Sequence, residues 1–320
     1  MISRRILRIK VLQTIYSFYQ GGDSDISKSE KELLYSIQKS YDLYFYLFLL
    51  GIEVCKYAES VINSKKQKLL ATETDKNPSL KFVNNKFLEQ FKENADFQRQ
   101  VNGKKMSWAN YPELPKRIFT TLEQTDEYQA YMQKASSSYE DDKKIVAFMF
   151  ENVIYDCDLF YQTLEEMSVY WIDTAEFIIG MVLKTIERYK LGFDSSYPLA
   201  KMFKNDDDRD FVMKLFRRTI AKDEYYRNLI SENTQNWDIE RIAFLDILIL
   251  QTALAEVECF PEIPLKVTFN EYIELAKNYS TAKSSIFVNG VLDKIVSKLL
   301  EEKKITKIAE MPNQTEKNED

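Results

Sequence analysis

Apolar residues recur along nearly the whole chain with the spacing of a helix. The first apolar stripe is carried by Leu7, Val11, Ile15 and Phe18. These positions lie three or four residues apart, which places them on one helix face, and a glycine pair at 21–22 ends that helix. The same spacing predicts further helices at about 29–62, 143–190 with a break near 168, 208–231, 238–257, 265–279 and 283–302. Because strand signals are few, the sequence predicts an all-α fold whose core is built from facing apolar stripes.

Polar segments divide the helical pattern. Residues 63–81 and 100–116 contain prolines and are predicted to be irregular, and 192–198 form another break. The serines at 136–138 precede an acidic stretch, which is typical of a loop that ends at a helix N-cap. The tail from residue 303 is polar and charged, and we expect it to be disordered.

No segment has the length and apolarity of a membrane span. The most apolar run, at 43–54, is about a dozen residues long and contains Glu53, whereas a spanning helix needs roughly 20 apolar residues. The N-terminus carries arginines without the apolar stretch and cleavage site of a secretory signal. The sequence therefore predicts a cytoplasmic protein that does not associate with membranes.

The composition excludes several kinds of catalytic site. Histidine is absent, which removes histidine-based nucleophilic triads, proton shuttles and histidine metal sites. Seven glycines occur without the spacing of a dinucleotide-binding or P-loop motif. Cys55, Cys157 and Cys259 are about a hundred residues apart and form no CxxC pair, which argues against a zinc site or a disulfide framework. We expect no catalytic residues, no metal and no cofactor.

One acidic run has the spacing of a magnesium-binding motif. Residues 206–210 read DDDRD, which matches the DDxxD pattern of isoprenoid enzymes. A second acidic motif to face it is not evident, and the run precedes an apolar helix that begins near Phe211. Acidic residues at such a position complement the positive end of the helix dipole. We therefore favour a structural role at a helix N-terminus.

Positive charge is concentrated at the start of the chain. The net charge is −6, but residues 1–20 carry +4 and no acid, while 21–200 carry −6. Cations in a first helical turn oppose the helix dipole, so a phosphate backbone would be a favourable partner for Arg4, Arg5 and Arg8. The alternative is a basic terminus that pairs with acids elsewhere in the fold. From this segment alone, the two interpretations are about equally supported.

Four segments carry a family resemblance. They are IPLKVTFNEYIELAK at 263–277, FVNGVLDK at 287–294, WDIER and DILIL at 237–241 and 246–250, and QTIY at 13–16 behind the arginines. In this order they resemble the signature of the NusB family of transcription antitermination factors. The resemblance covers about 1–20 and 205–300, roughly a third of the chain.

The resemblance implies an all-α, NusB-like fold of two helical bundles with a mostly helical insertion after the first helix. Residues 1–20 would be the first core helix and 201–302 the rest of the core. Residues 21–200 would be the insertion, in which about 168–190 replace the family's second helix, and 303–320 the disordered tail.

The resemblance also implies a function without enzymatic activity. Family members bind boxA-type single-stranded RNA in ribosomal RNA leader transcripts. They do so with a small-subunit ribosomal protein that acts as a Nus factor. The complex loads onto the elongating RNA polymerase, which the family protein reaches indirectly, and suppresses premature termination. Family members differ in whether they form homodimers, so the resemblance leaves this question open.

The resemblance assigns roles to particular residues. RNA-binding candidates are Arg4, Arg5, Arg8, Gln13, Tyr16, Lys283, Phe287 and Asn289. The arginines and the lysine would contact phosphates, the two aromatic rings would stack on bases, and the two amides would meet base edges. The alternatives are core positions for the rings and a local helix distortion at Asn289. Glu240 and Asp246 match positions on the family's partner-facing helix and are assigned to the ribosomal protein, with surface solvation as the alternative.

Three positions depart from the family pattern. Gln251 and Ala255 stand where the family commonly has arginine and tyrosine, which puts the partner surface in doubt, and Lys283 stands at an often acidic position.

Two other functions are therefore considered. One is a protein-interaction scaffold without RNA binding. The other is an RNA cytosine methyltransferase, which is weaker because the glycine-rich cofactor segment and the paired catalytic cysteines are missing.

Overall fold

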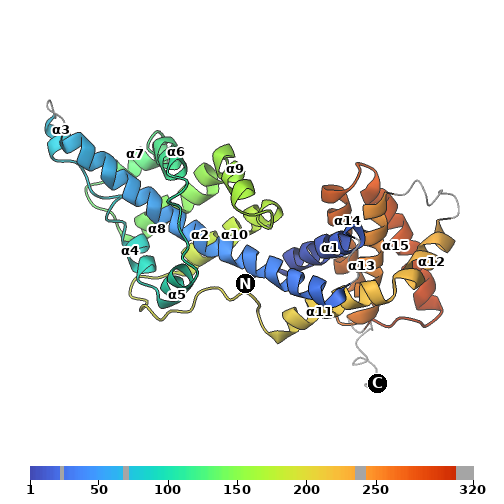
Figure 1. Cartoon of the computed structure of the whole chain (residues 1–320). Helices are drawn as coiled ribbons and strands as arrows, with labels where there is room; N and C mark the ends of the chain where they lie inside the picture. Colours follow the sequence, from blue (N-terminus) through green and yellow to red (C-terminus); the bar gives the residue numbers. More distant parts are fainter. Residues whose placement is uncertain (22–24, 68–71, 235–242, 308–320) are drawn as a thin grey trace, which may run out of the picture. The chain divides into compact units, whose positions relative to one another are not determined.

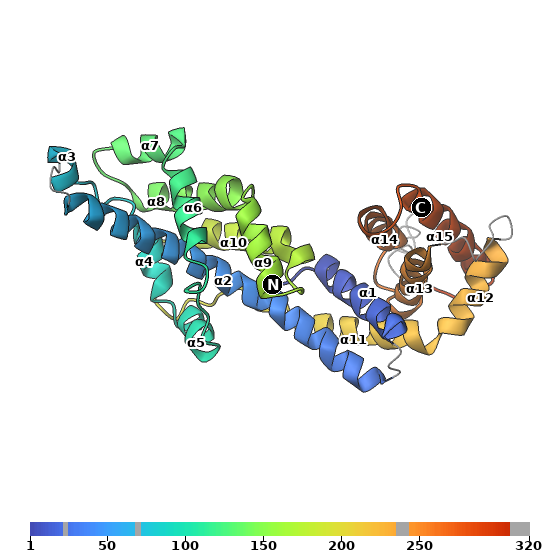
Figure 2. The ribbon, with the colours of Figure 1, turned by 45° about the horizontal axis from the view of Figure 1, so that its top comes forward.

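The computed structural model describes residues 1–21, 25–67, 72–234 and 243–307, and in these ranges the ordered elements are helices (Figures 1 and 2). The α-helices are α1 (Arg4–Gln20), α2 (Ile26–Lys66), α3 (Glu73–Lys76), α4 (Lys86–Lys92), α5 (Ala95–Gly103), α6 (Glu113–Leu122), α7 (Asp126–Gln133), α8 (Tyr139–Phe148), α9 (Asp158–Met167), α10 (Ala175–Arg188), α11 (Asp206–Ala221), α12 (Asp223–Asn233), α13 (Phe244–Cys259), α14 (Leu265–Tyr279) and α15 (Ser284–Glu301). A π-helix, η1 (Met149–Ile154), and a 3-10 turn, η2 (Ile172–Thr174), complete the set. The all-α prediction is confirmed. Among these helices, none combines the length and the apolarity needed to cross a bilayer.

The chain divides into two compact units. The insertion unit comprises residues 1–2 and 36–202, and the core unit comprises 3–35 and 203–320. The sequence analysis places the first boundary after residue 20, whereas the units divide within α2, after Tyr35. The start of α2 belongs to the core unit because Leu33 is buried and Arg217 of α11 forms a bidentate ion pair with Glu30. The second boundary, after Met202, lies two residues beyond the predicted one.

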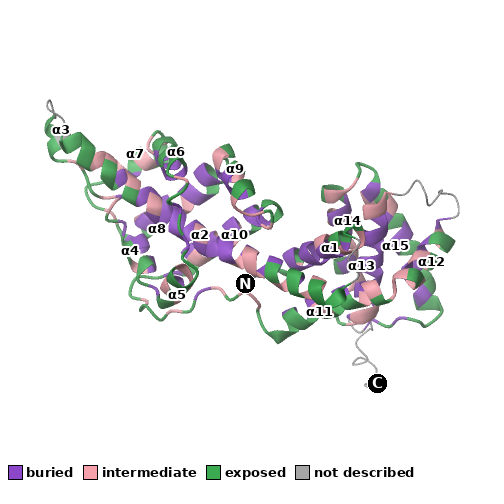
Figure 3. Ribbon diagram, viewed as in Figure 1, coloured by how far each residue is buried: buried purple, intermediate pink, exposed green. Residues whose placement is uncertain are grey.

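Helix α13 forms the centre of the core unit. It is apolar around its whole circumference, and its residues from Asp246 to Val257 are buried (Figure 3). A helix of this kind must be enclosed by other elements, and α1, α11, α12, α14 and α15 all pack against it. The first helix of the chain is therefore part of the same core as helices that lie more than 200 residues later.

The insertion unit has an aromatic core of its own. Its fully buried rings include Tyr44, Phe45, Phe48, Phe87, Phe91, Phe97 and Tyr189. The rings of Phe48 and Phe91 stack with their centroids 3.8 Å apart. At Gly51, a Cβ atom would meet Met149 and Phe150 of the π-helix at 3.4 Å, so glycine allows a close approach between α2 and η1. These aromatic residues of the middle segment thus serve as core.

Several predicted helices are divided in the structure. The pattern over 143–190 is carried by α8, η1, α9, η2 and α10, with the expected break at Ser168 and a further one at 155–157. The pattern over 208–231 is split at Lys222, after which Asp223 and Glu224 begin α12. Acidic residues in a first turn favour a new helix start at that point. Apolar spacing alone does not show such boundaries, because residues on both sides face the same core.

The segment after α15 continues to pack for a few residues. Ile305 is buried, and the buried Lys307 donates a hydrogen bond from its Nζ to the carbonyl of Phe260 at 2.9 Å. The tail predicted to be disordered begins at residue 303, and its part from 308 to 320 lies outside the described residues.

Candidate nucleic-acid interface

Arg8 lies in the core rather than on the surface. Its side chain is 3% exposed and forms two hydrogen bonds, of 2.7 and 2.8 Å, to the fully buried carboxylate of Glu256 on α13. Thr268 and Tyr272 of α14 donate two more hydrogen bonds to this carboxylate. Burial by itself lowers the pKa of Arg8, but the hydrogen bonds and charge of Glu256 outweigh it and hold the pKa above its usual value. Arg8 is therefore a structural cation, and its predicted contact with phosphate does not fit this position.

Arg5 and Arg4 remain partly exposed, and both are ion-paired. The Nε and Nη2 atoms of Arg5 donate to the two oxygens of Glu271 on α14, each at 2.9 Å. Arg4 donates from Nε to Asp208 at the start of α11, at 3.1 Å. The guanidinium groups of Arg4 and Arg8 also lie over the ring of Phe211, 4.9 and 5.4 Å from its centroid. Both exposed arginines thus already have carboxylate partners.

These contacts revise the interpretation of the basic N-terminus. Its cations have no acidic neighbours within the first twenty residues, but α11, α13 and α14 supply one carboxylate for each arginine. The alternative of pairing with acids elsewhere in the fold is the arrangement found here. Opposite charges at these distances largely cancel the local positive field.

The second half of α1 carries the aromatic candidate. Tyr16 is 43% exposed, and its ring lies 6.0 Å from that of Phe244, the first residue of α13. Gln13, one turn earlier, is half-buried and accepts a hydrogen bond from the buried Lys10 at 3.4 Å. At about 1.5 Å per residue, Tyr16 lies about 18 Å along the helix from Arg4. Tyr16 and the arginines therefore occupy different ends of α1.

The start of α15 is tied to the start of α13 by a buried polar contact. Ser284 donates a hydrogen bond from its hydroxyl to Asp246 at 2.7 Å, and Thr281 and Ser280 lie within hydrogen-bonding distance of the same hydroxyl. This contact positions the exposed Lys283 and the half-buried Phe287, which follows one turn later. Lys283, Phe287 and Tyr16 are thus all placed around the N-terminal ends of α13 and α15.

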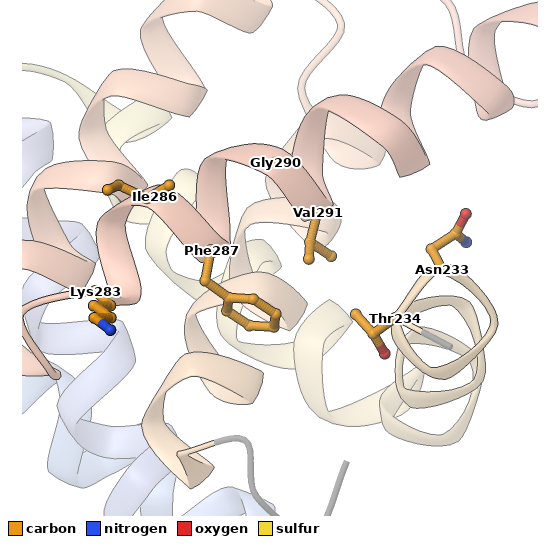
Figure 4. Close-up of a pocket in the computed structure, with 7 residues that line it drawn as sticks. All are labelled: Asn233, Thr234, Lys283, Ile286, Phe287, Gly290 and Val291. Atoms are coloured by element: carbon orange, nitrogen blue, oxygen red, sulfur yellow. The ribbon is translucent and has the colours of Figure 1, made fainter. Parts of the chain in front are cut away.

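A pocket of about 410 Å³ lies beside this end of α15. Its lining residues are Asn233, Thr234, Lys283, Ile286, Phe287, Gly290 and Val291 (Figure 4). The ring of Phe287 lies between Lys283 on one side and Thr234 with Val291 on the other, while the side chain of Asn233 points away from the ring (Figure 4). Asn289 is exposed on α15 but does not line the pocket. The pocket offers an aromatic face with a cation at its rim.

Asp246, one of the two residues assigned to the protein partner, is not on the surface. Asp246 is 5% exposed, and its Oδ1 atom is buried without a hydrogen-bond partner in the described structure. Gln251 and Ala255 are fully buried, and Gln251 donates to the carbonyl and carboxylate of Asp223. A direct contact of Asp246 with a partner does not fit this burial, because α13 is enclosed by other helices. Glu240, the other assigned residue, lies outside the described residues.

The acidic run at the start of α11 takes part in local contacts. Residues 206–208 form the first turn of the helix, and Asp208 accepts hydrogen bonds from Arg4 and from the backbone N–H of Lys204. In the part of the chain that the structure describes, no three potential metal-ligating side chains converge. The first turn of α11 thus provides a carboxylate for α1.

The structure adds residues that the sequence analysis did not single out. Ile286 is 77% exposed beside Phe287, although an isolated isoleucine in a helix pattern gives no sign of exposure. Glu271 and Glu256 are the partners of Arg5 and Arg8; Glu271 lies in the quoted segment 263–277, and Glu256 lies between two quoted segments. Only the fold shows that these acids face α1, because they are about 250 residues away in the chain.

Comparison with known proteins identifies most of the core unit together with residues 181–202 of the insertion unit. The model of the NusB family matches residues 181–297. The transcription antitermination protein NusB of Salinibacter ruber is 42% identical over 99 residues, which is 31% of this chain and 62% of that protein. The NusB protein of Chloroherpeton thalassium is 40% identical over 85 residues, 27% of this chain and 40% of its own length. The chain thus spans less than two thirds of these two relatives. No solved structure matches the chain.

A further relative is covered more completely. The transcription antitermination protein NusB of Natranaerobius thermophilus is 32% identical over 110 residues, which is 34% of this chain and 79% of that protein. Helix α1 lies outside the residues matched by the family model and still packs into the core unit with α11 and α13. The chain belongs to the NusB family.

Proposed function

We propose that this protein is a transcription antitermination factor that binds boxA-type single-stranded RNA together with a small-subunit ribosomal protein. It acts on the elongating RNA polymerase through this complex and catalyses no reaction. The observation that carries the proposal is that Lys283 and Phe287 line one pocket at the start of α15 in a NusB-family core. Ser284 ties this end of α15 to the start of α13, where Tyr16 lies beside Phe244. Unpaired bases stack on exposed aromatic rings, and lysine attracts the flanking phosphates.

The exposed arginines are expected to add phosphate contacts at the edge of the RNA-binding surface. Arg4 and Arg5 retain about 36% and 44% of their side-chain exposure, so phosphate can approach them from solvent. Arg8 supports the interface only by holding α1 against α13. The RNA-binding surface that we propose therefore comprises Tyr16, Lys283, Ile286 and Phe287, with Arg4 and Arg5 as peripheral phosphate contacts.

RNA binding by the purified full chain is the direct test. We expect a short boxA-like RNA to bind in a salt-sensitive manner and to bind more tightly when the ribosomal protein is present. A scrambled RNA of equal length controls for sequence preference. If no RNA binds at either of two salt concentrations, with or without the ribosomal protein, the proposal is wrong.

Replacing Phe287 by alanine is expected to weaken RNA binding by about 5- to 150-fold. Stacking of a base on an aromatic side chain contributes about 1–3 kcal/mol, and this contribution is lost with the ring. Fluorescence anisotropy with a labelled RNA measures the change. Phe177→Ala, which removes an exposed ring of α10 in the insertion unit, is the matched control and should leave the affinity unchanged. Equal affinities of the two variants would remove Phe287 from the interface.

One observation favours the scaffold alternative. The arginines at the start of α1 are paired with carboxylates, so this end of the helix has little net positive charge. A scaffold would bind the ribosomal protein equally well with and without RNA. An RNA-binding factor would show mutual enhancement of the two affinities, because coupling between two ligands is reciprocal.

A further inference from the structure

We propose that Glu271 is a built-in competitor of RNA, a carboxylate that occupies Arg5 and that a phosphate group must displace. The inference rests on the proposed function, because it concerns how the same interface is opened to RNA. It makes Glu271 a regulatory residue of the interface, although Glu271 itself contacts no RNA.

Arg5 binds Glu271 with the same pair of N–H donors that an arginine offers to a phosphate group. The Nε and Nη2 atoms of Arg5 each donate to one oxygen of Glu271 at 2.9 Å. Arginine presents the same two donors to a phosphate, so the two anions compete for one set of atoms. The hydrogen bond and charge of Glu271 also raise the pKa of Arg5, and Arg5 stays charged in both states.

The burial of the two partners allows the exchange. The side chain of Arg5 is 44% exposed and that of Glu271 is 18% exposed, so the pair is at the protein surface. Surface ion pairs contribute little free energy because water solvates both charges. Glu271 also lies 3.8 Å from the Nη1 atom of Arg8, so its carboxylate keeps a cationic neighbour after Arg5 is released.

The neighbouring arginine shows the contrast. Arg8 and Glu256 are almost completely buried, and Glu256 accepts two additional hydrogen bonds. Opening that pair would leave a buried charge without a partner, which is strongly unfavourable. Only Arg5 combines a bidentate carboxylate with access from solvent among the arginine pairs of the described part of α1.

The comparison of Glu271→Gln with Glu274→Gln tests the proposal in the full chain. Both substitutions remove one negative charge from α14. Glu274 forms its ion pair with Lys277 and acts on Arg5 through its charge alone, whereas Glu271 also occupies the Arg5 donors. We expect Glu271→Gln to bind a boxA-type RNA about three- to fivefold more tightly, since an exposed pair contributes at most a factor of about five. The slope of log affinity against log salt should stay the same, because Arg5 neutralises one phosphate in both chains once Glu271 is displaced. Glu274→Gln should increase affinity less than Glu271→Gln, because it removes a charge near Arg5 but frees neither of its donors.

A second background separates competition from a general charge effect. In a chain that carries Arg5→Gln, the further substitution Glu271→Gln should no longer increase affinity, because the competed cation is gone. Thermal unfolding of each variant verifies that the core unit is folded. If Glu271→Gln is unstable, Glu271→Asp retains the charge, shortens the side chain and should also bind RNA more tightly than the original chain.

The outcomes distinguish this proposal from the proposed function. If the original chain and all variants fail to bind RNA, both the proposed function and the proposed competition between Glu271 and RNA are wrong. If RNA binds but Glu271→Gln behaves like Glu274→Gln, only the competition is overturned. Weaker binding by Glu271→Gln would also overturn it, since Glu271 would then hold Arg5 in position for phosphate.

Discussion

Replacing Arg8 by methionine is expected to lower the free energy of unfolding of the core unit by about 3–5 kcal/mol. The substitution preserves much of the apolar stem but leaves the carboxylate of Glu256 fully buried without its cation. Thr268 and Tyr272 continue to donate to that carboxylate, but two neutral donors do not balance a buried charge. The loss of stability is measured by urea-induced unfolding, which is monitored through hydrogen exchange in peptides of α13.

Two further variants make the result specific. Arg8→Met combined with Glu256→Met removes both charges and should recover a large part of the lost stability, because an apolar pair can replace a buried ion pair. Arg5→Met, which breaks the exposed pair with Glu271, should lower stability by no more than about 1 kcal/mol. If Arg8→Met and Arg5→Met have equal effects, the burial of the Arg8 pair is not what stabilises the attachment of α1.

Replacing Phe91 by alanine is expected to lower the free energy of unfolding of the insertion unit by about 3–5 kcal/mol. Phe91 is fully buried, stacks on Phe48 and lies within 6 Å, centroid to centroid, of Phe97 and Tyr189. Removal of the ring leaves a cavity among rigid aromatic neighbours that cannot collapse onto it. RNA affinity should stay unchanged under conditions in which the unit remains folded, because the proposed RNA-binding surface belongs to the core unit.

The fluorescence of the tryptophans provides a convenient signal for this experiment. Trp108 and Trp171 are buried in the insertion unit, where their indole N–H groups donate to the carbonyls of Tyr46 and Lys39. Phe177→Ala, at an exposed position of the same unit, should change stability by no more than about 0.5 kcal/mol. A loss of RNA affinity in folded Phe91→Ala would show that the insertion unit takes part in RNA binding.

The candidate interface was only partly predictable from sequence. The aromatic candidates follow from the family signature, and the structure places Tyr16 and Phe287 with partial exposure. The three arginines look equivalent in the sequence, yet one is a core residue and two form surface pairs. Helical periodicity does not separate them, because a long cationic side chain on the inner face is tolerated wherever the fold supplies a carboxylate. Asp246 is a second example in which charge does not predict exposure, since this acidic residue of a signature helix is buried.

The sequence by itself determined the helical class, most helix positions, the absence of histidine chemistry and the family to which the core belongs. These properties depend on local spacing and on residue types that can be read along the chain. Only the tertiary structure decided that the chain divides within α2, that α1 completes a core formed by α11 to α15, and which charges meet. Such contacts join residues up to 266 positions apart, and their free energy depends on burial and distance. A linear pattern therefore shows that Arg5, Arg8, Glu256 and Glu271 are present, whereas the fold alone shows which of them pair and which pair is open to solvent.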